Sequence, residues 1–265
     1  KRPRGFLVGL VLQMVALPLL AFLITLLIPG LSPELKIGII LLAACPGGAT
    51  SNLVNYLLNG NLALSVSITT ANSFLTQFTI PFYVNIGLYF FMNSGTDIEL
   101  PFLKTLLQIL YITVIPAVLG VVIRSKAPQF AEKVRNPLKY IMTTLLAIAM
   151  IGAIFVENNE QLDIPIGDYW MVLPLLLLLN FGSMFMSFYT AKYFRLGIKS
   201  QTTIAIEVGL QNTALAIAVA ASPLMLNNPA FAIPAAMYAL FSFFTTLGFG
   251  VGANWKQHKR LFKFR

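Results

Sequence analysis

Residues 206–212 read Ile-Glu-Val-Gly-Leu-Gln-Asn and interrupt an otherwise apolar stretch over 200–222. Glu207 is the only carboxylate of the chain that falls deep inside a hydrophobic stretch. A charged side chain at the centre of a bilayer costs about 2.5–3.5 kcal/mol on insertion scales, so it normally has a partner and a function. No Lys or Arg falls deep inside any apolar stretch. The unpaired acid therefore indicates a bound cation.

The composition is that of a membrane protein, with 57% hydrophobic residues, 10% charged residues and a mean hydropathy of +0.80. It excludes an ordinary soluble domain and indicates an all-α polytopic membrane protein. Apolar stretches long enough to cross a bilayer predict eight spans. They cover residues 5–28, 36–59, 61–92, 101–123, 137–156, 168–190, 200–222 and 230–252. The third stretch is longer than one crossing needs, so we expect it to tilt, to bend near Pro81 or to end outside the bilayer.

The basic residues predict the orientation of the spans. If the first residue lies in the cytoplasm and the spans alternate, every Lys and Arg except Lys36 and Lys104 falls in a cytoplasmic segment. This agrees with the positive-inside rule and places the C-terminus in the cytoplasm too. The net charge of +9 is therefore a topology signal, and no nucleic-acid partner is expected.

Two of the predicted spans contain a polar break. In 36–59, Pro46 lacks a backbone donor and Gly47 and Gly48 follow it, so the helix should open there. The next residues, Thr50, Ser51 and Asn52, are of types that cap a new helix. In 200–222, the polar residues around Gly209 interrupt the helix in the same way. Opened backbone at membrane depth is tolerated where protein or a water-filled cavity surrounds it, which favours a transport site.

The positions of the breaks predict a symmetry. They lie in spans two and seven, which cross the membrane in opposite directions, and each span is flanked by one further span on either side. This pattern is typical of an inverted-topology repeat with two discontinuous helices that cross near the midplane. Spans four and five have no counterparts before the first triplet, so two further helices are expected upstream, giving ten in all.

Two motifs carry a resemblance to a known family. Residues 45–52, Cys-Pro-Gly-Gly-Ala-Thr-Ser-Asn, and 207–212, Glu-Val-Gly-Leu-Gln-Asn, resemble the signatures of the bile acid:sodium symporter family, in particular its bacterial members. The similarity runs from Lys1 to about Trp255 and includes 60–65. It implies a core domain made of 1–92, with its broken helix at 36–59, and of 168–252, with its broken helix at 200–222. It also implies a panel domain over 101–156, followed by a basic cytoplasmic tail over 253–265.

The resemblance further implies two coupling sodium ions behind the crossing. The first would bind Ser51, Asn52, Ser65, Thr69 and Glu207. The second would bind Glu207, Gln211 and Gln13, with the backbone carbonyls of Val208 and Leu210. The chemistry agrees, because sodium is a hard cation that takes carboxylate, amide, hydroxyl and backbone oxygens. Ser65 and Thr69 are four residues apart and should share one helix face.

The expected cargo is an organic anion, such as a bile salt or a small carboxylate like pantoate or a 2-oxo acid. We expect it to bind at Ala49, Thr50 and Asn212, where helix N-termini meet the crossing. Members of the family often read Gly-Gly-Thr-Ala-Ser-Asn, whereas this chain has Ala49 before Thr50, so the hydroxyl is displaced by one residue. The sequence thus predicts a sodium-coupled symporter embedded in lipid, in the inner membrane of a bacterium.

Three alternatives stay open at this point. Glu207 would be the titrating group of a proton-coupled carrier or antiporter. Cys45, the only cysteine, lies where a metalloid efflux carrier of the same fold superfamily would bind its substrate, although a small packing residue is also expected there. A receptor would bind ligand without moving it. An enzyme is not expected, because no nucleophile–base pair and no His/Asp/Glu cluster falls in the spans.

Overall fold

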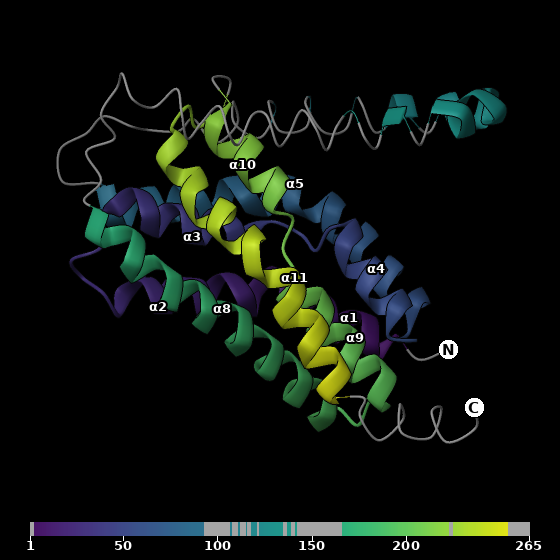
Figure 1. Ribbon diagram of the computed structural model, residues 1–265, viewed down its shortest axis with the longest axis horizontal. Helices are drawn as coiled ribbons and strands as arrows, with labels where there is room; N and C mark the ends of the chain where they lie inside the picture. Colours follow the sequence, from purple (N-terminus) through teal and green to yellow (C-terminus); the bar gives the residue numbers. More distant parts are fainter. Residues whose placement is uncertain are drawn as a thin grey trace.

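The computed structural model describes residues 3–92, 166–222 and 225–253, together with shorter pieces between 107 and 141. These parts are helical and contain no strand. The helices are α1 (Arg4–Val11), the π-helix η1 (Leu12–Ala16), α2 (Leu17–Leu26), α3 (Pro33–Ala44), α4 (Ala49–Leu57), α5 (Leu62–Met92), α8 (Ile166–Tyr193), α9 (Ile198–Gly209), α10 (Thr213–Ala221), the 3-10 helix η2 (Pro229–Ala232) and α11 (Ile233–Ala253) (Figure 1).

Five of these segments are long and apolar enough to cross a membrane, and a sixth is the bent pair α3 and α4. The fold is therefore that of an all-α polytopic membrane protein, as the composition predicts. Predicted spans four and five, which make up the panel over 101–156, fall largely outside the described residues, as does the tail beyond Ala253. The division into core and panel domains stays a prediction.

The two broken helices enter the bundle from opposite ends. Figure 1 shows α3 and α9 starting at opposite ends and meeting at its centre, where α4 and α10 continue. The start of α1 and the end of α11 lie at one and the same end (Figure 1). This arrangement has the directions that an inverted repeat requires. The repeat itself and the side that faces the cytoplasm remain predictions.

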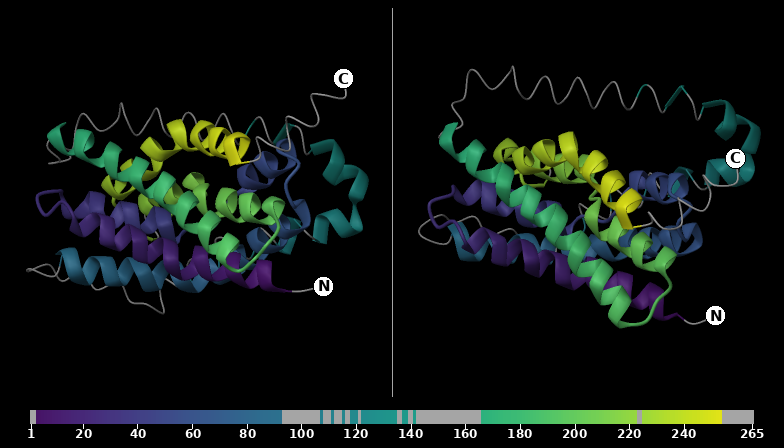
Figure 2. Two further views of the ribbon diagram at one scale, coloured as in Figure 1. Left: turned by 90° about the horizontal axis from the view of Figure 1, so that it is seen from below. Right: turned by 60° about the horizontal axis from the view of Figure 1, so that its bottom comes forward.

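The half-helices before the breaks are enclosed on all sides. Residues 35–44 of α3 and 201–209 of α9 are all buried, as expected for helices that other helices surround. Helix α5 packs against α1 and α3, and Figure 2 shows it running beside α1. It is continuous over 31 residues although Pro81 lies inside it. Its outer face carries the exposed Phe74, Phe78 and Phe82, four residues apart, a surface that suits hydrocarbon rather than water.

Candidate functional site

The first break is opened by its own sequence. Helix α3 ends at Ala44, Cys45 is extended (ψ 149°), and Gly48 is extended before α4 begins at Ala49. The axes of α3 and α4 differ by 58°. The N-cap of α4 is Gly48, without a side-chain cap, so the expectation that Thr50, Ser51 or Asn52 caps this helix is wrong. Because the two glycines let the backbone bend before position 49, these side chains fall in the first turn instead and can face the site.

The second break leaves its two halves in one candidate span, Ile198–Ala221. Helix α9 ends at Gly209, Leu210 is extended (φ −109°, ψ 115°), and Asn212 caps α10 through its side chain, which accepts from the Leu215 N–H at 3.1 Å. The Asn212 N–H donates to the Pro46 carbonyl at 2.8 Å. A direct backbone hydrogen bond therefore joins the two breaks.

Glu207 lies in the last turn of α9 and is fully buried. Its Oε1 contacts the Ser65 hydroxyl and lies 3.2 Å from Asn55 Nδ2, and its Oε2 lies 2.7 Å from Thr69 Oγ1. Ser51 also lies beside the carboxylate. These contacting groups are all neutral, so the contacts leave the negative charge of the carboxylate uncompensated.

The first break also lies directly against this acid. A methyl group added at Gly47 would lie 3.0 Å from the Glu207 carbonyl oxygen, 3.1 Å from its Oε2 and 3.3 Å from Ser51 Oγ. Ser65 Oγ lies 2.7 Å from Asn52 Oδ1 as well. The five residues predicted for the first sodium ion, Ser51, Asn52, Ser65, Thr69 and Glu207, therefore share one polar cluster between α4, α5 and α9.

Gln13 bridges the two breaks from η1. Its Nε2 donates to the Cys45 carbonyl at 3.1 Å and to Gln211 Oε1 at 2.9 Å. It lies in the π-helix η1, a local widening that is frequent at functional sites, and the Tyr83 hydroxyl donates to the Met14 carbonyl there at 2.9 Å. The Oε1 of Gln13 is buried and has no hydrogen-bond partner within the described residues. Gln13, the residue that joins the two breaks, therefore has a side-chain oxygen that can accept a further ligand.

Of the residues predicted for the second ion, Gln13, Gln211 and Val208 are connected by hydrogen bonds. Gln211 Nε2 donates to the Val208 carbonyl at 2.6 Å, and Gln211 Oε1 accepts from Gln13. Leu210 is the extended residue between them. Of the residues predicted for the anion, Ala49 and Thr50 are exposed, and Asn212 is half-buried beside Gly48, whose added methyl group would lie 3.6 Å from Asn212 Cγ. All three flank the start of α4 or α10.

Three polar residues of this region were not predicted from the sequence. Asn55 Nδ2 lies within hydrogen-bonding distance of Ser65, of Glu207 and of the Ser51 carbonyl, and its spacing of four from Ser51 is a signal that could have found it. Asn180 and Tyr238 both contact the Gly209 carbonyl. Asn180 is an isolated amide in an apolar stretch, which is a usable signal, whereas Tyr238 stands in an aromatic run of the kind that is typical of ordinary packing.

Comparison with known proteins identifies relatives. The chain is 27% identical over 241 residues (91% of this chain) to the uncharacterized sodium-dependent transporter YocS of Bacillus subtilis. It is 30% identical over 233 residues (87% of this chain) to a probable chloroplastic sodium/metabolite cotransporter, BASS2, of Oryza sativa subsp. japonica. It is 28% identical over 224 residues (81% of this chain) to the ileal sodium/bile acid cotransporter of Oryctolagus cuniculus.

The relatives are longer than this chain. The chain covers 71% of the Bacillus protein, 52% of the rice protein and 60% of the rabbit protein. The sequence pattern of the sodium bile acid symporter family matches residues 1–163, which contain the first break, Gln13, Ser65 and Thr69. With this match over more than half of its length, the chain belongs to the sodium bile acid symporter family, a family of transporters and not of enzymes.

Proposed function

We propose that the protein is a secondary active transporter that couples the inward flow of sodium to the uptake of an organic anion. The observation that carries this proposal is the buried Glu207 carboxylate, whose contacts are neutral oxygen- and amide-bearing side chains from two helices, α4 and α5. A buried carboxylate without a compensating charge is strongly destabilising. A small hard cation would neutralise it and accept the surrounding oxygens as ligands.

The first sodium ion would bind in the cluster between α4, α5 and α9. Glu207 provides the charge, Ser65 and Thr69 provide hydroxyl oxygens from one face of α5, and Ser51 and Asn52 provide oxygens from the first turn of α4. These groups now hydrogen-bond to one another, so an ion that enters the cluster replaces those bonds with coordination. The Thr69 hydroxyl also bonds within its own helix, as threonine in membrane helices usually does, since its Oγ1 lies 3.0 Å from the Ser65 carbonyl. The contact with Glu207 across helices is not explained in that way.

The second sodium ion would bind at the end of α9. Its ligands would be Glu207, Gln13 and Gln211, together with the carbonyls of Val208 and Leu210. The partnerless Oε1 of Gln13 supports this assignment, because a buried amide oxygen without a donor is rare unless an ion or a water fills its place. The C-terminal end of a helix also carries partial negative charge, which favours a cation there.

The anion would bind on the exposed side of the crossing, at Ala49, Thr50 and Asn212. The N-termini of α4 and α10 lie there, and their positive dipole ends favour negative charge. Bile salts and small carboxylates such as pantoate or a 2-oxo acid fit this chemistry. The names of the relatives mention bile acid in one case and an unspecified metabolite in another, so both classes are candidates for this chain.

Coupling would follow from the hydrogen bond between the two breaks. Sodium on the α9 side fixes the backbone of both breaks, because Asn212 N–H and the Pro46 carbonyl are joined. The same backbone forms the anion site on the other side. Binding of sodium would therefore order the anion site, and the loaded core would then move against the panel helices to expose the cargo on the other side of the membrane.

The deciding experiment is an uptake assay in proteoliposomes with sodium on the outside, compared with potassium or choline at the same ionic strength. Sodium-dependent accumulation is expected. Uptake that is unchanged without sodium but follows a proton gradient would instead assign Glu207 as a proton carrier. The cargo can be found by a thermal-stability screen of organic acids with and without sodium, since a true cargo should stabilise the protein only when sodium is present.

A further inference from the structure

A buried hydrogen-bond network binds the carbonyl of Gly209, the last residue of α9. Asn180 Nδ2 donates to the Gly209 carbonyl at 2.9 Å and to the Tyr238 hydroxyl at 2.8 Å, and the Tyr238 hydroxyl donates to the same carbonyl at 2.6 Å. Thr245 Oγ1 lies 2.7 Å from Asn180 Oδ1. Asn180 and Tyr238 are both fully buried. The network therefore joins α8 and α11 to the end of α9.

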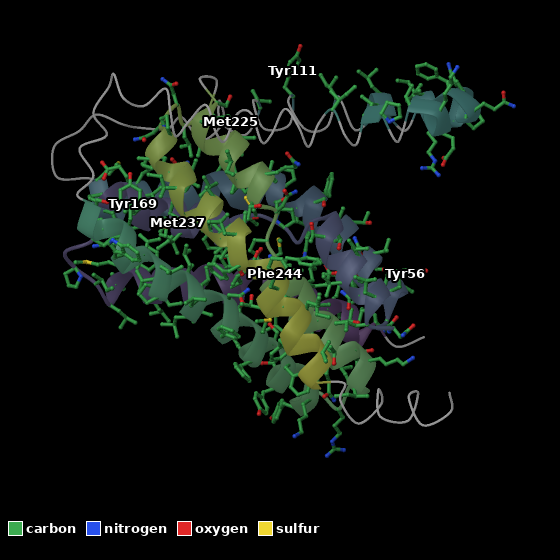
Figure 3. The ribbon with its side chains drawn as sticks, in the orientation of Figure 1. Tyr56, Tyr111, Tyr169, Met225, Met237 and Phe244 are labelled. Atoms are coloured by element: carbon green, nitrogen blue, oxygen red, sulfur yellow. The ribbon has the colours of Figure 1, made fainter. Side chains whose placement is uncertain are left out.

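Figure 3 labels two side chains of α11 that lie outside this network, Met237 and Phe244. Phe244, labelled there, is 71% exposed, and Met237, also labelled, is partly exposed. Tyr238 differs from both, because it is turned into the protein and its ring is in contact with Phe241. A buried tyrosine hydroxyl normally has a hydrogen-bond partner. Here that partner is the backbone of the second break.

The network replaces a donor that the break removes. In an unbroken helix the Gly209 carbonyl would accept from the N–H of residue 213. The Thr213 N–H instead donates to the Gln211 carbonyl at 3.0 Å. Asn180 and Tyr238 supply two donors in its place, so this carbonyl is satisfied without an ion. The carbonyl of Val208 likewise loses the Asn212 N–H, which donates to Pro46, and takes the side chain of Gln211.

Because the Gly209 carbonyl is held in place, the direction of the backbone after Gly209 is held as well. The peptide plane between Gly209 and Leu210 is held at one end by Asn180 and Tyr238, and at the other by the Leu210 N–H, which donates to the Ile206 carbonyl at 3.0 Å. Since a peptide unit is planar, the direction in which the extended Leu210 leaves the helix is set by these bonds. The Val208 carbonyl belongs to the peptide unit before this plane, and the Leu210 carbonyl to the peptide unit after it.

We propose that Asn180 and Tyr238 are positioning residues for sodium, which hold the Gly209 carbonyl and thereby orient the neighbouring Val208 and Leu210 carbonyls toward the ion. The inference rests on the proposed sodium site at the end of α9. It assigns the sodium affinity in part to side chains of α8 and α11 that do not touch the ion. Thr245 contributes more weakly, because it acts on Asn180 alone.

The test measures the sodium concentration that gives half of the maximal thermal stabilisation of the full chain, with sodium chloride exchanged for choline chloride at constant ionic strength. Tyr238→Phe removes one of the two donors, and we expect it to raise this concentration about threefold to fivefold. Asn180→Leu removes a donor to the carbonyl and the support for Tyr238, and about tenfold is expected. Thr245→Val should give about twofold.

The matched control is Tyr189→Phe, because Tyr189 is 59% exposed on α8 and lies outside the network. It should leave the half-saturating sodium concentration unchanged. Each variant is also melted without sodium. If Tyr238→Phe lowers the sodium-free melting temperature but leaves the sodium concentration unchanged, the network is merely structural and the inference is wrong. If Asn180→Leu does not fold, the comparison of Tyr238→Phe with Tyr189→Phe decides alone.

The outcome for the wild-type protein separates this inference from the proposed function. If sodium does not stabilise the wild-type protein more than choline does, the proposed sodium coupling fails and the inference fails with it. If sodium stabilises the wild-type protein and all three network variants behave like Tyr189→Phe, the sodium site stands and only the positioning role is overturned.

Discussion

The two helix breaks lie against each other, yet they contribute different groups to the site. The first is a backbone feature: Pro46 and the two glycines after it turn the chain by 58°, and the polar side chains come afterwards, in the first turn of α4. The second keeps its halves in one span, and its acid comes before the break, in the last turn of α9. The first break is made by proline and glycine, which carry no polar side chain, whereas the second break carries the charged Glu207.

This difference supports the proposal that one crossing binds both a cation and an anion. The end of α9 presents the Glu207 carboxylate and the partial negative charge of helix carbonyls, which suit a cation. The starts of α4 and α10 present positive dipole ends, which suit an anion. The hydrogen bond from the Asn212 N–H to the Pro46 carbonyl connects the two sides. Two breaks with identical groups would present the same sign of charge to the cation and to the anion. The difference between the breaks would therefore allow both ligands to bind.

The largest effect is expected from removing the charge of the second break. Glu207→Gln keeps the size of the side chain but leaves no charge for sodium to neutralise. We expect sodium-dependent uptake to fall to the sodium-free background, while the sodium-free protein is as stable as the wild type or more stable, since a buried uncompensated charge has been removed. Uptake and melting temperature with and without sodium measure both effects.

Glu34→Gln is the control for this variant, because Glu34 lies in the first turn of α3, away from the breaks. It should retain sodium-dependent uptake. Sodium-dependent uptake that survives Glu207→Gln would overturn the assignment of Glu207 and with it the unequal roles of the two breaks.

The second effect tests the backbone of the first break. In Gly47→Ala, the new methyl group would meet the Glu207 carbonyl oxygen at 3.0 Å and its Oε2 at 3.1 Å. These atoms belong to a backbone and to a carboxylate held by other helices, so the Glu207 backbone and carboxylate would have to shift by a few tenths of an ångström. We expect the half-saturating sodium concentration for uptake to rise by more than tenfold.

Gly248→Ala is the matched control, because a methyl group there meets no atom within 4 Å and Ala favours the helical conformation. It should leave the sodium response as it is in the wild type. A normal response in Gly47→Ala would mean that the breaks need not lie in contact.

A smaller effect is expected from the hydroxyl groups on α5. Thr69→Val removes an oxygen that lies 2.7 Å from Glu207 Oε2, and the half-saturating sodium concentration for uptake should rise about fivefold to tenfold. Thr70→Val is a close control. Thr70 Oγ1 also bonds to its own helix, 2.7 Å from the Val66 carbonyl, but its side chain is exposed. If both variants give the same shift, Thr69 acts on its helix and not on the site.

Glu207 and the first helix break could be predicted from the sequence for physical reasons, whereas the ligand sets came from the family resemblance. Glu207 was conspicuous because a charge in an apolar stretch is costly, and the Pro46 break because proline and glycine have known effects on helices. The all-α membrane fold followed from composition in the same way. Each of these signals is local, so reading along the chain is enough to find it.

The parts that were missed depend on contacts between distant segments. Asn180 and Tyr238 are 58 residues apart, and nothing in either stretch tells that both contact the Gly209 carbonyl. The π-helix around Gln13 contains no proline or glycine from which it could be predicted. It is recognised only from the hydrogen bonds of the folded helix. The N-cap of α4 was misplaced because three residues of capping type follow one another, and the backbone geometry at Gly48 decides among them.

The smallest effect is expected from Cys45→Ala, which tests whether residues 45–48 contribute backbone groups rather than side chains to the site. Cys45 is fully buried among apolar side chains, and its carbonyl, not its thiol, accepts the hydrogen bond from Gln13. Cys45→Ala keeps that carbonyl and removes one buried sulfur, so uptake and its sodium dependence should stay within about twofold of the wild type, with a slightly lower melting temperature. Cys45→Ser, which keeps a polar group of similar size at the same place, should behave alike in uptake. Loss of transport in Cys45→Ala with normal folding would show that the thiol binds the cargo, as a metalloid carrier requires, and the first break would then have to be regarded as a source of side-chain ligands like the second.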